Sequence, residues 1–472
     1  MNGVIIVEHK IYYINKEGVM AHKHAISKTK ALLTAIGFMI GSGIFFRADN
    51  IIGATGGNVV VSILAWIVTA TTLVFAGISI AAIASQKNIE GGFVGYIGHY
   101  FSQWFGEKIG RTLEFIIGWY QIVVYAPIMV GIVGIVFGGY FCQLFGMEGT
   151  VLEVHGIAVI LLVAMFLWNK ASTKIAATIS ATATSIKVIP LIVIAIAGIV
   201  FGNPGELSNT VLPGVFDKNP TFTALLFAPM LSMAFAFDGW ISVGALSEDI
   251  DDPKKNLPGI FVWSVIITSV VYIAYFVGVN ALMGPAEIIE LGDSHVGVIA
   301  NNLFGNMGEK LVLTGVLISV LGTTNALFMA GTRYVQKLAC NDLLIGSDKL
   351  KQFSNTDTPA NASMFIVVGT MIYIGLYAMQ ASGATFLQGI TIDDIPLALN
   401  AAFYLLVFYI TFKLYAEKKV SAMQGVFAPI VATLGQLFVI FAFFLTNDKA
   451  VLYMIISFIV IALGFVNKMK SK

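Results

Sequence analysis

The stretch GFMIGSGIFF, residues 37–46, places three glycines in the middle of the first long apolar run of this sequence. Glycine inside a helix costs about 1 kcal/mol relative to alanine, so this cluster requires an explanation. Two interpretations are open. Gly37 and Gly41 form a G-x-x-x-G pair, which lets two helices pack closely. Alternatively, the helix is interrupted at residues 41–43 and its backbone groups are exposed to bind a ligand.

The composition is that of a helical membrane protein. Of the 472 residues, 57% are hydrophobic and 11% are charged, whereas about a quarter of the residues of a soluble protein are charged. Several apolar runs reach the roughly 20 residues that a helix needs to cross a bilayer. The net charge of +1 disfavours nucleic acid as a partner, because nucleic acid requires a basic surface. We therefore expect the lipid bilayer to surround the chain.

Twelve hydrophobic runs are long enough to span a membrane, and we expect an all-α integral membrane protein with twelve transmembrane helices. An even number of spans places both termini on the same side. The predicted spans are 29–55, 57–86, 108–142, 153–169, 173–202, 220–250, 257–283, 308–342, 361–380, 394–415, 424–446 and 448–467.

Positive charges are distributed unevenly between the two sides of these spans. Lys and Arg on the side of the termini number 22, the opposite side holds 4, and the remaining one of the 27 is Lys187. Cytoplasmic loops of membrane proteins are enriched in Lys and Arg. We therefore expect a multi-pass protein of the cell membrane with cytoplasmic N- and C-termini.

The sixth predicted span is interrupted like the first. FAPMLSMAFAFDGWISVGALSEDI (227–250) carries Pro229 near its start and Asp238 and Gly239 at its middle. These residues disfavour an unbroken lipid-facing helix. Spans one and six correspond in an inverted repeat of five plus five spans, in which broken helices bind the substrate. This pattern predicts a cytoplasmic leader (1–28), a first repeat (29–202), a second repeat (220–415) and two further spans (424–467).

An unwound helix exposes groups of opposite polarity. The N–H groups that begin the second half-helix lie at its positive end, and the carbonyls that end the first half-helix lie at its negative end. An α-amino acid carries a carboxylate and an ammonium and suits both. We expect the carboxylate on amides near Ser42–Ile44, and the ammonium on carbonyls near Phe38–Ile40 and Ala234–Phe237. Gly37, a turn earlier, matches no part of this site and is interpreted as a packing residue.

Lys187 lies within the fifth span, ATATSIKVIPLIVIAIAGIV. A lysine at a helix centre costs roughly 2.5–3.5 kcal/mol on insertion scales, so it should face protein. Its long side chain can also extend to the cytoplasmic surface, and this alternative stays open. In a repeat of five plus five spans, the fifth span packs beside the first and eighth. Sodium-coupled transporters with this repeat bind a cation there, and the ammonium of Lys187 can replace that ion. Its expected partners are then carbonyls of the first half-helix and the hydroxyl of Thr323 or Thr324.

Several motifs resemble a known family. IGSGIFF with GATGG behind it, IEGGFVGYIGHYF (89–101), GWYQIVVYAP (118–127), SIKVIPLIV in the fifth span and VLGTTNALFMAGTRYVQKLA (320–339) are similar to the amino acid–polyamine–organocation superfamily. FAFDGWISVGALSEDIDDPKKNLPG (235–259) is the most specific motif and resembles the L-amino acid transporter subfamily, in particular bacterial serine/threonine exchangers. The similarity runs from about residue 28 to 340.

The resemblance implies a fold and a set of site residues. It implies a leucine-transporter-type repeat, alternating access and amino acid exchange without sodium. Lys187 matches the family's fifth-span lysine, and Tyr272 matches a seventh-span tyrosine that some relatives place near the substrate. The substrate-backbone site that the resemblance implies consists of Gly41, Ser42, Gly43, Ile44, Ala236, Phe237 and Gly239.

The sequence lacks the motifs that are typical of other functional classes. No nucleotide-binding G-x-x-x-x-G-K-[ST] loop occurs, none of the six histidines lies in a metal-ligand spacing, and no catalytic constellation of an enzyme is present. We expect no cofactor and no metal. Asp238 has two open interpretations, a helix cap or a proton carrier.

The sequence thus predicts a secondary transporter rather than an enzyme or a channel. The expected substrates are small or medium neutral L-amino acids of the serine, threonine and alanine type, which the protein would exchange without sodium. Proton-coupled amino acid uptake and amino acid/amine antiport remain the alternatives.

Overall fold

The first predicted span folds as three short helices rather than one. In this computed structural model α1 (Lys28–Met39) ends at the glycine stretch, α2 (Gly43–Phe46) follows it, and α3 (Ala48–Ala54) completes the run. Ser42 lies outside the described residues. The structure describes residues 3–7, 10–14, 20–21, 27–41, 43–87, 89, 91–171, 173–208, 222–247, 250–352, 359–388 and 391–470.

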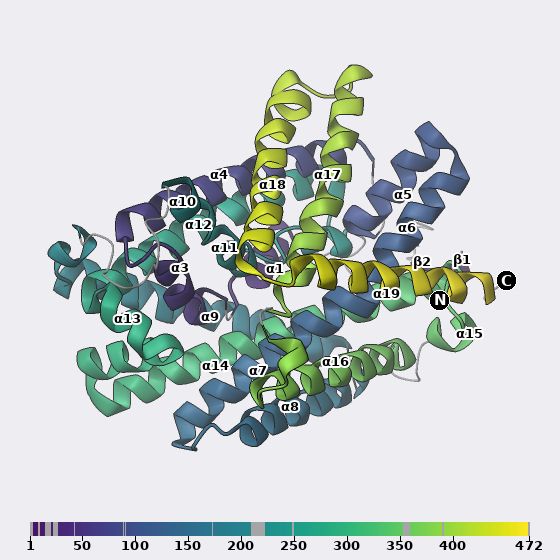
Figure 1. The fold of residues 1–472 in the computed structure, drawn as a ribbon. Helices are drawn as coiled ribbons and strands as arrows, with labels where there is room; N and C mark the ends of the chain where they lie inside the picture. Colours follow the sequence, from purple (N-terminus) through teal and green to yellow (C-terminus); the bar gives the residue numbers. More distant parts are fainter. Residues whose placement is uncertain are drawn as a thin grey trace.

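Most of the remaining helices of the first half are long (Figure 1), and several are apolar enough to cross a membrane. The π-helical turn η1 joins α6 to α7, so that the third predicted span is continuous. The elements are α4 (Val59–Ala84), α5 (Gly92–Phe105), α6 (Glu107–Tyr120), η1 (Gln121–Tyr125), α7 (Ala126–Phe145), α8 (Val151–Ala171), α9 (Thr173–Phe201) and η2 (Pro204–Ser208).

The second half begins with another divided span. The sixth predicted span folds as α10, α11 and η3, with turns between them. Its elements and those that follow are α10 (Phe222–Phe227), α11 (Met230–Ala236), η3 (Ser242–Leu246), α12 (Pro253–Met283), α13 (Pro285–Leu291), η4 (Gly292–Ser294), α14 (His295–Cys340), α15 (Ser347–Leu350), α16 (Ala360–Ala381), η5 (Thr385–Leu387), α17 (Asp394–Ala416), η6 (Met423–Phe427), α18 (Ala428–Thr446) and α19 (Ala450–Lys470).

Two structural details bear on the predicted boundaries. The predicted leader contains a small antiparallel sheet of strands β1 (Gly3–Val7), β2 (Lys10–Ile14) and β3 (Met20–Ala21). From α1 onward, the elements of the described residues are helices. The backbone of Gly305 is not helical, so α14 consists of two helices that meet there, and the eighth predicted span, 308–342, corresponds to the second of them.

Eight helices among the described residues are long and apolar enough to cross a membrane. Three shorter apolar helices lie within the predicted spans five, six and twelve, over Ser185–Phe201, Leu225–Ala236 and Ala450–Phe465. The first predicted span has no such helix because its glycines divide it.

Helix packing separates the molecule into two groups. In one group α12 packs against α1 and α4, and α11 packs against α2 and α4. In the other, α7, α8, α14 and α16 pack against one another, as they do along the lower part of Figure 1. Helix α9 contacts both groups, since it packs against α1, α12, α8 and α14. The site described next lies where the two groups meet.

Candidate functional site

The two helix breaks lie in direct contact. A Cβ atom at Gly43 would lie 2.9 Å from the Cα atom of Ala236. A Cβ atom at Gly239, whose φ is +87°, would lie 3.1 Å from the carbonyl oxygen of Phe38. Side chains at these positions would push the two backbones apart, and the positive φ of Gly239 favours glycine. The glycines at the two breaks therefore allow the two backbones to lie close together.

The hydroxyl of Tyr272 joins the ends of the two interrupted helices. It lies 2.7 Å from the carbonyl oxygen of Met39, the last residue of α1, and 2.9 Å from that of Ala236, the last residue of α11. Because a tyrosine hydroxyl has one hydrogen, the two carbonyls share a single donor. Tyr272 thus occupies two of the acceptors at which we expect the substrate ammonium.

The side chain of Lys187 extends to the end of α1. This is the alternative in which it does not extend to the cytoplasmic surface. Its side chain is buried, and its Nζ atom donates hydrogen bonds to the carbonyl oxygen of Gly37 and to the Thr323 hydroxyl, 3.4 Å away. The Thr323 hydroxyl in turn lies 3.4 Å from the carbonyl oxygen of Ile40. The backbone carbonyl of Gly37 therefore belongs to this cluster, and the interpretation of its missing side chain as a packing feature stays a prediction.

Thr323 and Thr324 differ in what they contact. The Thr324 hydroxyl donates to Val320 of its own helix at 2.7 Å, so it is not a partner of Lys187. Thr323 also packs closely against the glycine stretch, since a Cβ atom at Gly41 would lie 2.8 Å from the Thr323 side chain. Gly41 thus allows α14 to approach the first break.

Aromatic side chains enclose the second break. Phe237 is buried, and its ring centroid lies 5.1 Å from that of Tyr272 and 5.7 Å from that of Trp66 in α4. Ile44 in α2 is buried as well. Trp66 was missed by the sequence analysis, because one tryptophan in an apolar span does not reveal which helix it faces.

Asp238 pairs with a neighbouring helix. One of its carboxylate oxygens accepts a hydrogen bond of 2.5 Å from the hydroxyl of Tyr125 in η1. The short helix η3 begins with Ile241 at its cap position and has no side-chain cap. The interpretation of Asp238 as a helix cap is therefore wrong for η3.

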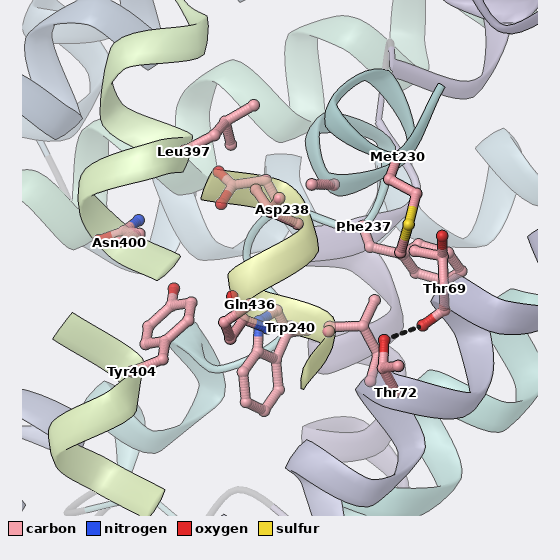
Figure 2. A pocket seen from close by; sticks show the side chains of 14 residues that line it. Thr69, Thr72, Met230, Phe237, Asp238, Trp240, Leu397, Asn400, Tyr404 and Gln436 are labelled. Atoms are coloured by element: carbon pink, nitrogen blue, oxygen red, sulfur yellow. Dashed lines mark hydrogen bonds between the residues drawn. The ribbon is translucent and has the colours of Figure 1, made fainter. Parts of the chain in front are cut away.

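A small cavity lies beside Asp238, and Figure 2 shows the side chains around it. It is bordered by α4, by the turn after α11, and by α17 and α18. Asn400 and Gln436 are among its lining residues, and neither was singled out in the sequence. The sequence shows that both amides lie inside predicted spans, where amides are rare. It does not show that they lie near Asp238.

A buried ion pair lies beside the two interrupted helices. Arg47, between α2 and α3, pairs with Asp393, the residue that precedes α17. The guanidinium also lies 4.7 Å from the ring centroid of Phe235 in α11. This pair joins both interrupted helices to α17.

No group of three or more His, Cys, Asp or Glu side chains in the described part of the chain is placed to hold a metal ion. The polar groups at the breaks are instead backbone carbonyls, hydroxyls, one ammonium and one carboxylate. Together they suit a small zwitterionic ligand.

Comparisons with known proteins show which family the chain resembles. A family model described as "Amino acid permease" matches residues 26–466. The serine/threonine exchanger SteT of Bacillus subtilis is 28% identical over 429 residues, covering 91% of this chain and 93% of that protein. The human cystine/glutamate transporter is 23% identical over 317 residues, covering 66% of this chain and 60% of that protein.

The fold also has a counterpart among solved structures. The crystal structure of MhsT in complex with L-phenylalanine superposes with a TM-score of 0.58 at 14% identity, covering 95% of this chain and all of that one. The likeness at this level of identity concerns the fold. It extends over almost the whole chain.

Proposed function

Because the chain belongs to the amino acid permease family, we propose that it is a secondary transporter that exchanges small or medium neutral L-amino acids without sodium. The family and the relatives are amino acid transporters rather than enzymes. The substrate class and the independence from sodium are our proposal. They rest on the side chains around the two breaks.

One observation supports the proposal most directly, the position of the Lys187 ammonium. It donates to Gly37 at the end of α1 and to Thr323 of α14. Carbonyls at a helix C-terminus attract a cation, and the bound ammonium takes that position permanently. A transporter with this arrangement needs no sodium ion to hold α1 against α14.

The proposed substrate site lies at the two breaks. The carboxylate would bind amides of residues 41–44, and the ammonium would bind carbonyls at the ends of α1 and α11 in place of the Tyr272 hydroxyl. Neutral side chains suit the wall formed by Phe237 and its aromatic neighbours. The proposed substrate-binding residues are Gly41, Ser42, Gly43, Ile44, Ala236, Phe237, Gly239 and Tyr272.

The proposed architecture is a twelve-span bundle with two inverted repeats, 29–202 and 220–415, followed by two spans within 424–467. Alternating access would arise as α1, α4, α11 and α12 rock against α7, α8, α14 and α16. The Arg47–Asp393 pair would then hold one side closed. We place both termini in the cytoplasm of a cell-membrane protein, from the distribution of Lys and Arg.

Proton-coupled uptake is the second candidate, and Asp238 favours it. This carboxylate lies at the second break and has a tyrosine hydroxyl as its partner. A carboxylate in such a position can take up and release a proton.

The test uses the purified full-length chain in vesicles loaded with serine, with alanine or with buffer alone. We expect labelled serine to enter loaded vesicles, with or without sodium, and to enter vesicles without internal amino acid far more slowly. Uptake that requires sodium would refute the role of Lys187. Uptake into vesicles without internal amino acid, driven by a pH gradient alone, would replace exchange by proton coupling.

A further inference from the structure

A second cavity, far larger than the one beside Asp238, lies between α16 and α19, which run alongside each other in Figure 1. Its volume is about 730 Å³, against about 30 Å³ beside Asp238. Binding sites for small molecules typically hold about 300–1,000 Å³. The sequence offered no role for α19, the last predicted span, beyond lipid contact or dimerisation. We call this cavity the α16–α19 groove.

Each of the two helices lines the groove with one face. The lining residues recur every three or four positions from Asn361 to Leu376 on α16 and from Tyr453 to Val460 on α19, which is the spacing of a single helix face. Residues 122–124 of η1 line the groove as well. Helix α19 packs against α6 and α18, whereas α16 packs against α7, α8 and α14. The two faces are thus anchored by different neighbours, and the groove lies between them.

The groove is apolar and open to the outside of the molecule. Val368 and Ile372 of α16 are 53% and 61% exposed, and Ile456 of α19 is 43% exposed. Helix α16 is long and apolar enough to span a membrane, and α19 contains a shorter apolar helix. The groove therefore opens into the hydrocarbon core of the bilayer, and its occupant must be apolar along most of its length.

The length of the groove suits one acyl chain. Helix α16 rises roughly 22 Å between Asn361 and Leu376, at 1.5 Å per residue. One leaflet contributes about half of a hydrocarbon core that is roughly 30 Å thick. An acyl chain of one leaflet can therefore lie in the groove over its full length.

One end of the groove carries polar and basic groups. Leu350 of α15 and Asn361 line this end, and the Asn361 amide donates a hydrogen bond of 2.8 Å to the carbonyl oxygen of Lys349. The Lys349 side chain is exposed, whereas that of Lys351 is already paired with two aspartates. An asparagine amide has two hydrogens. Lys349 and Asn361 can thus offer a positive charge and a donor to a phosphate.

We propose that the α16–α19 groove binds an anionic phospholipid, with one acyl chain along α16 and the phosphate at Lys349 and Asn361. With cytoplasmic termini, as proposed above, this end of the groove faces the cytoplasmic leaflet, which carries anionic lipids. A zwitterionic headgroup brings its own cation to Lys349 and gains less. An uncharged occupant such as a sterol leaves Lys349 without a counter-charge.

The bound lipid contacts two elements that belong to the candidate site. Val124 of the groove precedes Tyr125, whose hydroxyl donates to Asp238. Ile392 of the groove precedes Asp393 of the buried ion pair. An acyl chain in the groove supports η1 and the start of α17 from the lipid side, so its removal should lower the stability of the protein.

The first test measures the lipid that stays bound to the full-length chain after purification in mild detergent. We expect native mass spectrometry to show a bound phospholipid on the wild type and its loss in Ile372→Trp, which fills the groove. Met371→Trp is the matched control, because Met371 is 40% exposed and does not line the groove. Should Ile372→Trp fail to fold, Ile456→Trp fills the groove from α19.

Two results of this test would overturn the proposal. One is a wild type without bound phospholipid, or equal retention by the groove-filling variant. The other is a dimer that the groove-filling variant dissociates, because the occupant would then be a second copy of the chain.

The second test concerns the headgroup and uses the delipidated protein in detergent. Saturating phosphatidylglycerol should raise the thermal unfolding midpoint by roughly 5 °C, and phosphatidylcholine should raise it less. Lys349→Glu should abolish this difference, whereas Lys254→Glu, at an exposed lysine of α12, should keep it. Equal midpoints of the wild type with the two lipids would refute an anionic ligand. Neither test depends on transport, so both remain decisive if the proposed exchange is wrong.

Discussion

The buried ammonium of Lys187 is held by uncharged groups, the Gly37 carbonyl and the Thr323 hydroxyl. Each hydrogen bond to a charged group contributes about 1.5–3 kcal/mol. We therefore expect Lys187→Ala to reduce amino acid uptake roughly a hundredfold while the protein is still inserted in the membrane. Uptake per milligram of reconstituted protein measures the effect.

Lys310 provides the control for this substitution. It is exposed, so Lys310→Ala should transport at the wild-type rate. Undiminished transport by Lys187→Ala would show that the ammonium does not act as the fixed cation.

Tyr272 and Tyr275 form a second matched pair, one turn apart on α12. The Tyr272 hydroxyl contacts the ends of both interrupted helices. The Tyr275 hydroxyl is buried and has no hydrogen-bond partner among the described residues. We expect Tyr272→Phe to change KM for serine about tenfold and Tyr275→Phe to change it less than twofold. Equal effects of the two substitutions would mean that the Tyr272 hydroxyl does not determine KM.

At the level of helices, the Arg47–Asp393 pair links α2 and α3 to α17. Removing one partner of a buried ion pair typically costs about 3–5 kcal/mol. We therefore expect Arg47→Met and Asp393→Asn each to lower the thermal unfolding midpoint in detergent. The double variant should unfold near the temperature of either single variant.

The exposed pair of Arg111 and Glu107, 2.6 Å apart on α6, is the control. Surface ion pairs contribute about 0–1 kcal/mol, so Arg111→Met and Glu107→Gln should have small, additive effects. Additive losses at Arg47 and Asp393 would show that the two residues do not act as a pair.

The sequence predicts those parts of the site that break a local rule. Glycines in an apolar run, a lysine in a span and an Asp-Gly pair at membrane depth each conflict with an ordinary transmembrane helix, and so Gly41, Lys187 and Gly239 could be identified. The carbonyl of Gly37 as a partner of Lys187 and the position of Gln436 in the same cavity lining as Asp238 could not. A backbone carbonyl leaves no trace in the sequence, and an amide in a span does not reveal its neighbours.

The order of helices is similarly predictable, and their ends are less so. Long apolar runs specify α4, α8 and α12 because hydrophobic length is a strong signal. The sequence analysis did not identify the break at Gly305 within α14 or the strands before α1.

For the molecule as a whole, the orientation in the membrane is testable through one thiol. Cys340, at the end of α14, is exposed, whereas Cys142 is buried. With cytoplasmic termini, the α14 end that carries Cys340 faces the cytoplasm. A membrane-impermeant maleimide should label Cys340 in inside-out vesicles and leave right-side-out vesicles unlabelled. Labelling confined to right-side-out vesicles would invert the topology.

The hydrogen bonds of the two breaks have a consequence for how tightly a substrate is held. Lys187, Thr323 and Tyr272 already contact the carbonyls of Gly37, Ile40, Met39 and Ala236. An arriving ammonium must compete with donors that the protein itself supplies, so the net gain in binding free energy is small. Weak affinity and a short residence time follow, and both favour rapid turnover in a carrier that must release its cargo on every cycle.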